Sequence, residues 1–160
     1  MQDTKVKMGF PPVYDENSRV LILGSFPSVQ SRKVSFYYGN KQNRFWRMIY
    51  SIFGEEYSED TEKKKAFLLK NGIALWDIAT ECQIEGSKDS TLKNAKIADL
   101  TPILQTANIQ KILLNGALAF QLFETKYNMI GIPYLKMPST SPANPRFSVE
   151  KWKEVLDDLR

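Results

Sequence analysis

The chain has 160 residues, of which 42% are hydrophobic and 25% are charged, so its length and composition fit one folded domain with a sizeable core. It has no histidine and one cysteine, Cys82, which excludes histidine-based catalytic triads, histidine-bearing zinc sites and an internal disulfide. The net charge of +4 is compatible with a polyanionic partner but does not require one.

Strand and helix patterns alternate through the first half of the chain. Residues 20–25, VLILGS, form a short apolar, β-branched run that stops at a glycine, as expected of a buried strand. Residues 45–53 repeat bulky apolar side chains at helical spacing, and residues 60–70 place acids before lysines, as a second helix would. Residues 73–78, IALWDI, predict another strand, whereas the polar segment 81–95 predicts irregular structure.

The same alternation continues through the second half of the chain. Residues 98–107 predict a third helix, residues 111–116 a third strand and residues 116–128 a strongly helical segment. A fourth strand is expected over residues 132–139, and a closing helix over residues 148–159. Strands that alternate with helices indicate an α/β fold, and we expect a three-layer α/β/α sandwich around a mainly parallel four-stranded sheet.

Ligands of such sheets bind beyond the carboxyl ends of the strands. The expected strand ends lead into residues 24–28, 76–77, 115–116 and 137–141. These stretches collect glycines, hydroxyl groups, amides and aromatic rings, so we expect the functional site at this edge of the sheet.

No apolar stretch approaches the ~20 residues that span a bilayer. The first ten residues, MQDTKVKMGF, lack the apolar centre of a signal peptide. We therefore expect one cytoplasmic domain over residues 1–160, a monomer with no membrane partner.

Residues 36–46, FYYGNKQNRFW, combine five aromatic rings with two asparagines and a glutamine, which neither a core helix nor a plain solvent loop would use. An N-cap role for Asn43, before the helix that starts near Phe45, explains part of this pattern. It does not explain the three rings before Gly39, which fit a surface on which a flat ligand stacks, although some of them could be core.

Two further segments are less specific by themselves. Residues 137–146, MPSTSPANPR, set three prolines around hydroxyl groups, which makes either an ordinary rigid loop or a stiff projection with donors for phosphate oxygens. Residues 24–28, GSFPS, lack the spacing of both glycine-rich phosphate-binding motifs and could simply shape a turn after the strand.

In this order, GSFPS, FYYGNKQNRFW, GIALWDI, LLNG and MPSTSPAN resemble the motifs of the uracil-DNA glycosylase superfamily, over residues 17–147. They are most similar to the hypoxanthine-DNA (deoxyinosine) glycosylase branch, near the mismatch-specific uracil/thymine enzymes. The resemblance implies a monofunctional DNA glycosylase that acts on damaged DNA in base excision repair. Such an enzyme hydrolyses the N-glycosidic bond of a deaminated base, hypoxanthine or uracil, after the base is flipped from the helix.

The first motif departs from that of the mismatch-specific enzymes, in which the asparagine of Gly-Ile-Asn-Pro orients the attacking water. Phe26 stands at the position of that asparagine in this chain. In the hypoxanthine branch an asparagine before Phe-Trp takes over catalysis, and Asn43 matches it, so the resemblance implies that Asn43 is the catalytic residue. Relatives often have His-Pro where this chain has Asn40-Lys41.

The remaining expected site residues fall into two groups. Those expected to bind the substrate base are Gly24, Ser25, Phe26, Pro27, Phe36, Tyr37, Asn40 and Asn115. Those expected to contact DNA, in part from the loop that enters the duplex in this family, are Ser28, Ser139, Thr140, Ser141 and Asn144.

This reaction can proceed without histidine, because the base departs while the sugar gathers oxocarbenium character and a positioned water attacks late. A neutral asparagine can hold that water, and preorganised N–H donors can stabilise the charge on the leaving base. We expect no metal and no cofactor.

Two other classes of function remain open. One is a catalytically inactive protein of the same fold that binds DNA lesions. The other is a small-nucleotide-binding α/β domain, which would need a phosphate-binding glycine loop and an acidic ribose partner that GSFPS does not supply. A helix-turn-helix DNA-binding protein does not fit the alternating strands.

Overall fold

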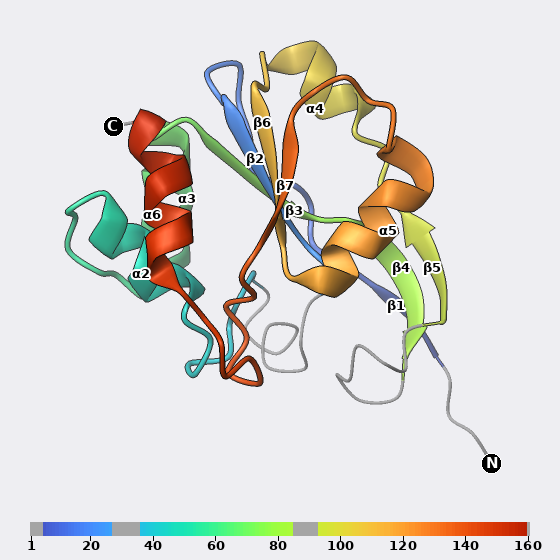
Figure 1. The fold of residues 1–160 in the computed structure, drawn as a ribbon, viewed down its shortest axis with the longest axis horizontal. Helices are drawn as coiled ribbons and strands as arrows, with labels where there is room; N and C mark the ends of the chain where they lie inside the picture. Colours follow the sequence, from blue (N-terminus) through green and yellow to red (C-terminus); the bar gives the residue numbers. More distant parts are fainter. Residues whose placement is uncertain (1–4, 27–35, 85–92, 160) are drawn as a thin grey trace.

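The computed structural model describes residues 5–26, 36–84 and 93–159. Its central sheet has four parallel strands in the order β3 (Ile73–Asp77), β2 (Val20–Gly24), β6 (Lys111–Asn115) and β7 (Tyr134–Met137) (Figure 1). The sequence-based prediction of a four-stranded parallel sheet is confirmed.

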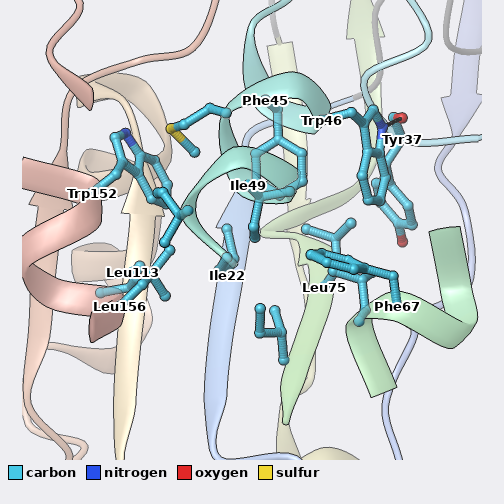
Figure 2. Packing of buried hydrophobic residues seen from close by; sticks show 14 of the residues in the cluster. Ile22, Tyr37, Phe45, Trp46, Ile49, Phe67, Leu75, Leu113, Trp152 and Leu156 are labelled. Atoms are coloured by element: carbon cyan, nitrogen blue, oxygen red, sulfur yellow. Dashed lines mark hydrogen bonds between the residues drawn. The ribbon is translucent and has the colours of Figure 1, made fainter. Parts of the chain in front are cut away.

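One face of the sheet is covered by α2 (Phe45–Ile52), α3 (Thr61–Lys70) and α6 (Val149–Leu156) (Figure 1). Ile22 of β2 and Leu113 of β6 point to this face and are fully buried there. Figure 2 shows the aromatic and aliphatic side chains that these helices pack onto the two strands.

The opposite face is covered by α4 (Thr101–Thr106) and α5 (Ala117–Tyr127). Leu23 and Leu114, each one residue further along its strand than those on the first face, are buried against Phe123 of α5. Successive residues of a strand point to opposite faces, so these apolar strands fill two separate cores. The three-layer α/β/α arrangement is therefore confirmed.

A second sheet was not expected from the sequence. Its three antiparallel strands lie in the order β1 (Lys5–Met8), β4 (Ala79–Ile84) and β5 (Lys93–Ile97). The prediction of irregular structure over residues 81–95 is therefore wrong at both ends of that segment.

The physical reason lies in how this small sheet is buried. Ala95 and Ile97 of β5 pack against buried apolar residues, whereas Lys96 between them is exposed. A strand with one face in solvent keeps many polar residues, and its pairing depends on its neighbours more than on its own composition.

Several elements are shorter than predicted. The helix expected over residues 98–107 begins only at Thr101, which keeps Pro102 in the first turn, where its missing N–H costs no hydrogen bond. The closing helix changes to a 3-10 turn, η2 (Asp157–Leu159). Among the described residues, no helix combines the length and the apolar character needed to cross a bilayer.

Candidate active site

The carboxyl ends of the parallel strands bring Gly24, Asp77, Asn115 and Met137 to one edge of the central sheet, which we call the rim. Gly24 lies opposite Asp77 in the β2–β3 pair, and Asn115 lies opposite Met137 in the β6–β7 pair. Two of these strands, β3 and β6, thus end in a polar side chain, and β2 ends in a glycine that has no side chain. The rim expected from the sequence is formed.

The aromatic rings of Phe36 and Tyr37 pack edge to face, with centroids 5.5 Å apart, whereas the Tyr38 ring packs on Phe45. Phe36 is 5% exposed and stacks on Trp46, with ring centroids 5.7 Å apart. Tyr37 is 2% exposed, and its hydroxyl lies 3.1 and 2.8 Å from the carbonyls of Phe10 and Pro11, to which it donates. Both rings are therefore largely buried in the core, and both also line the small pocket described below.

Tyr38 is the ring of this segment that reaches the rim. Its φ of +53° turns the chain immediately before Gly39, a conformation that few non-glycine residues adopt. Its ring stacks on Phe45, with centroids 4.2 Å apart, and its hydroxyl accepts a hydrogen bond of 3.0 Å from the side-chain amide of Asn115.

Asn115 also binds the loop that follows β7. Its Nδ2 donates to Oγ1 of Thr140, and its Oδ1 accepts from the backbone N–H of Thr140, both at 3.0 Å. Thr140 is fully buried, so its side chain has no surface for the phosphate contact expected of it. Asn115 thus uses its amide to join β6, the aromatic segment and the loop after β7, rather than leaving it open for a ligand.

Asn40 and Asn43 shape the backbone of their own segment. Oδ1 of Asn40 accepts from the N–H of Gln42, and Oδ1 of Asn43 accepts from the N–H of Phe45 at the start of α2, each at 2.9 Å. The N-cap of α2 is Arg44, which makes no side-chain cap hydrogen bond, so Asn43 is not the N-cap residue but bonds a free N–H of the helix from the preceding position. The amide nitrogen of Asn43 makes no hydrogen bond within the described part of the chain, so the –NH₂ group is the part of Asn43 that can serve a ligand.

Both amides line a small pocket of about 150 Å³. A buried protein cavity of this size can hold one benzene-sized ring. Lys64 and Tyr57 form part of the other wall, and burial is the main cause that lowers the pKa of Lys64.

The first motif after β2 is only partly described. Ser25 is half-buried, and its carbonyl accepts from the N–H of Ala79 at 3.0 Å. Phe26 is 9% exposed and packs with Ala79 in a small apolar cluster, so it supports the fold rather than presenting its ring at the rim. Pro27 and Ser28, expected to contact base and DNA, lie outside the described residues.

A carboxylate and a hydroxyl meet above Gly24. A Cβ on Gly24 would lie 2.5 Å from Oδ1 of Asp77 and 2.9 Å from the hydroxyl oxygen of Tyr38. Asp77 is 5% exposed. Burial, and next the charge of Asp77, raises the pKa of Tyr38 well above its usual range. Tyr38 therefore keeps its proton, which it can donate while its oxygen accepts from Asn115.

The loop over residues 138–146 is held in shape by its own side chains and by Arg44. The guanidinium of Arg44 donates to the carbonyls of Ser141 and Asn144, at 2.6 and 2.8 Å. The amide of Asn144 donates to the carbonyl of Ser139 at 2.9 Å. The stiff projection expected from the prolines is thus reinforced by hydrogen bonds.

A basic groove of about 650 Å³ runs beside this loop. Lys136, Arg146 and Lys151 line it together with Ser139 and Ser141, and no acidic residue is part of its lining. Within the described part of the chain none of the three cations forms an ion pair. This groove suits a polyanion, because its positive charges are exposed and uncompensated nearby.

Two rim residues, Asp77 and Tyr38, were not among the expected site residues. Asp77 ends an otherwise apolar strand, IALWD, and the strand-end rule already placed it at this edge. That signal could have assigned it a role. For Tyr38 the sequence offers no equivalent signal, since three adjacent rings look alike until the turn at Tyr38 separates them.

Comparisons with known proteins agree with this geometry. The family model for the uracil DNA glycosylase superfamily matches residues 11–160. A protein of Methanosarcina acetivorans named "Hypoxanthine DNA glycosylase" is 38% identical over 156 residues, which cover 94% of this chain and 98% of the relative.

A protein of the same name from Methanosarcina barkeri is 36% identical over 142 residues, covering 88% of this chain and 89% of the relative. The solution NMR structure of a Methanosarcina acetivorans protein superimposes with a TM-score of 0.85 at 37% sequence identity, covering 97% of this chain and 99% of that one.

Proposed function

The chain belongs to the uracil DNA glycosylase superfamily, and on that premise we propose that it is a monofunctional DNA glycosylase for deaminated bases, hypoxanthine first and uracil second. The observation that carries this proposal is that two relatives, aligned over most of their length, share the name hypoxanthine DNA glycosylase. The proposal includes a role in base excision repair, a cytoplasmic location and a monomeric state.

The proposed reaction breaks the bond between C1′ of the deoxyribose and N9 of hypoxanthine. The bonding electrons leave with the base, water adds its hydroxyl to C1′, and the remaining proton of that water passes to the base anion, directly or through solvent. We assign the positioning of this water to the amide of Asn43, which lines the same pocket as Asn40 and whose Oδ1 is engaged by the N–H of Phe45, leaving its –NH₂ group for the water. Loss of one preorganised donor of this kind typically costs ~3–4 kcal/mol of transition-state stabilisation.

The base must leave the DNA stack before its glycosidic bond can be reached, so the proposal includes base flipping. We assign the ring that stacks on the flipped base to Tyr38, in place of Phe36 and Tyr37, because Tyr38 is the ring of the three that lies at the rim. Stacking of one base on an aromatic side chain contributes ~1–3 kcal/mol.

DNA is proposed to lie along the loop over residues 138–146 and the basic groove beside it. Ser139 and Ser141 offer hydroxyl groups to phosphate oxygens, and Lys136 and Lys151 add charge without base recognition. Asn144 supports the loop's shape through its hydrogen bond to Ser139.

The test is a panel of labelled duplexes, each with one modified base, incubated with the enzyme in excess chelator and scored for abasic sites after alkali. We expect excision of hypoxanthine, weaker excision of uracil and no cleavage of the strand before alkali. Tight binding to lesion duplexes without excision of any base would favour the inactive lesion-binding protein instead.

A further inference from the structure

The proposed reaction leaves negative charge on the departing base, and this chain has no histidine to stabilise that charge. The charge spreads over the ring nitrogens and the carbonyl oxygens of hypoxanthine or uracil. Preorganised positive charge beside the leaving group lowers the energy of such a transition state, most strongly in a site that excludes water. The cations that line the pocket of Asn40 and Asn43 are the groups to compare for this role.

Positive charge predominates in the lining of that pocket. Three cations, Lys41, Arg47 and Lys64, line it together with one carboxylate, that of Glu59. Lys41 and Arg47 are exposed, whereas Lys64 is only 9% exposed. Water and salt screen a buried charge less than an exposed one, so Lys64 is the cation of the three whose charge acts with the least screening.

Two aromatic rings hold the ammonium group of Lys64 in place. Its Nζ lies 5.0 Å from the ring centroid of Trp46 on α2 and 5.8 Å from that of Tyr57, and both rings line the pocket. Trp46 is itself fixed, because its Nε1 donates to the carbonyl of Tyr37 at 2.8 Å. Cation–π contacts attract an ammonium group without neutralising it, so they position this charge before a ligand arrives.

Lys64 has no close counterion. Its neighbour Lys65 pairs with Glu62 at 3.4 Å, but no carboxylate in the described part of the chain lies within ion-pair distance of Lys64. Burial lowers the pKa of Lys64, and the more distant carboxylate of Glu59 opposes that shift and favours the charged form. A buried charge without an ion pair costs free energy, and desolvated ionisable groups in clefts gather at functional sites.

We propose that Lys64 is a catalytic residue whose ammonium group contacts the departing base and stabilises the negative charge that develops on it. This inference rests on the proposed glycosylase function and adds to it the group that assists the leaving base. Lys64 keeps its proton: the electrons of the glycosidic bond leave with the base, and the proton that later neutralises the base comes from the attacking water. Asn43 and Lys64 thus divide the reaction, since one holds the water and the other favours departure of the base. A point charge does not distinguish a purine from a pyrimidine, which fits a site proposed to accept both hypoxanthine and uracil.

The test compares single-turnover excision of each base with that of its fluorinated analogue in otherwise identical duplexes. The pairs are hypoxanthine with 2-fluorohypoxanthine and uracil with 5-fluorouracil. Fluorine withdraws electrons and stabilises the base anion, so excision of the analogue depends less on charge that the protein supplies. Lys64→Met, which keeps an apolar stem, should lower excision of hypoxanthine about 10²–10³-fold, the usual effect of removing one preorganised donor, and should raise the rate on each analogue relative to its parent base about tenfold.

Two further variants and a control separate charge from packing. Lys64→Gln is neutral but polar and should behave as Lys64→Met does, even if the apolar methionine disturbs the fold. Lys64→Arg keeps a positive charge on a longer, planar group, so its rate on hypoxanthine should exceed that of both neutral variants by about tenfold. Lys63→Met is the matched control, because Lys63 is exposed on the same helix, is not part of the pocket lining, and its loss changes the net charge equally. It should keep the wild-type rates and ratios, and thermal unfolding of each variant reports any loss of stability.

An equal loss on a parent base and its fluorinated analogue would overturn the inference, because a structural role of Lys64 would lower both rates alike. Wild-type rates in Lys64→Gln would overturn it as well, as would a folded Lys64→Arg protein no faster than Lys64→Gln. Failure of the wild type to excise hypoxanthine would instead contradict the proposed function itself.

Discussion

Replacement of Asn115 by alanine tests how the rim is held together. The Asn115 side chain forms three hydrogen bonds of 3.0 Å, one to the Tyr38 hydroxyl and two to Thr140. Asn115→Ala removes all three and leaves the backbone N–H of a fully buried residue, Thr140, without that partner.

The expected cost follows from the nature of these bonds. A neutral hydrogen bond contributes ~0.5–1.5 kcal/mol net, and a buried donor left unpaired costs ~1–3 kcal/mol. We therefore expect Asn115→Ala to lower the free energy of unfolding by about 2–4 kcal/mol. For a chain of this size that corresponds to a fall in Tm of roughly 5–15 °C. Thr140→Val, which removes one side-chain acceptor and keeps the backbone bond, should cost only about 1 kcal/mol.

The assay is urea unfolding of wild type and the variants, compared at unchanged m-value so that only stability differs. A double-mutant cycle with Tyr38→Phe should give a coupling energy above ~0.5 kcal/mol, as expected for residues in direct contact. Excision of hypoxanthine should also fall in Asn115→Ala, because Tyr38 and the loop after β7 lose their common support. An Asn115→Ala protein no less stable than Thr140→Val would refute the reasoning.

The remaining predictions concern the catalytic amide, the basic groove and alkaline pH. Asn43→Ala should lose at least a hundredfold in single-turnover excision while binding duplex normally. Asn43→Asp keeps the oxygen that accepts from the N–H of Phe45 but lacks the –NH₂ group, so it should be as inactive as Asn43→Ala. A greater loss of excision in Asn40→Ala than in Asn43→Ala would move the catalytic role to Asn40. Replacing both Lys136 and Lys151 by alanine should weaken duplex binding on lesion and normal DNA alike and lower the slope of log K against log salt by about 2; an unchanged slope would exclude the groove as a phosphate site. Because burial and a neighbouring carboxylate raise the pKa of Tyr38, the folded protein keeps that proton above pH ~10 whereas the unfolded chain releases it. Stability should therefore fall as pH rises above ~10, and less steeply in Tyr38→Phe, so equal slopes would contradict this assignment.

The central sheet could be predicted because its strands are short, apolar and separated by amphipathic helices. VLILG and KILLN carry the signal of strands buried on both faces. The second sheet could not be predicted in the same way, since β4 and β5 are polar and gain their strand conformation from pairing with each other and with β1. Strand propensity in such an exposed sheet depends on neighbours that the local sequence does not reveal.

The rim was predictable to the level of strand ends, but the orientation of single side chains was not. Asn40 and Asn43 line one pocket, as expected of site residues. The sequence did not reveal that their side-chain oxygens accept hydrogen bonds from backbone N–H groups of their own segment. Phe36 and Tyr37 are largely buried, although they line the pocket of Asn40 and Asn43, and the position of Tyr38 at the rim depends on one backbone turn with positive φ. Local composition identifies an aromatic segment, but tertiary packing decides which ring faces the site.

The most direct test of the proposed function is chemical identification of the products from a duplex with one deoxyinosine. The account predicts one molecule of free hypoxanthine per abasic site, with the strand intact until alkali and the reaction unaffected by chelator. Strand cleavage by the enzyme itself, or stable binding of the duplex without release of hypoxanthine, would contradict it.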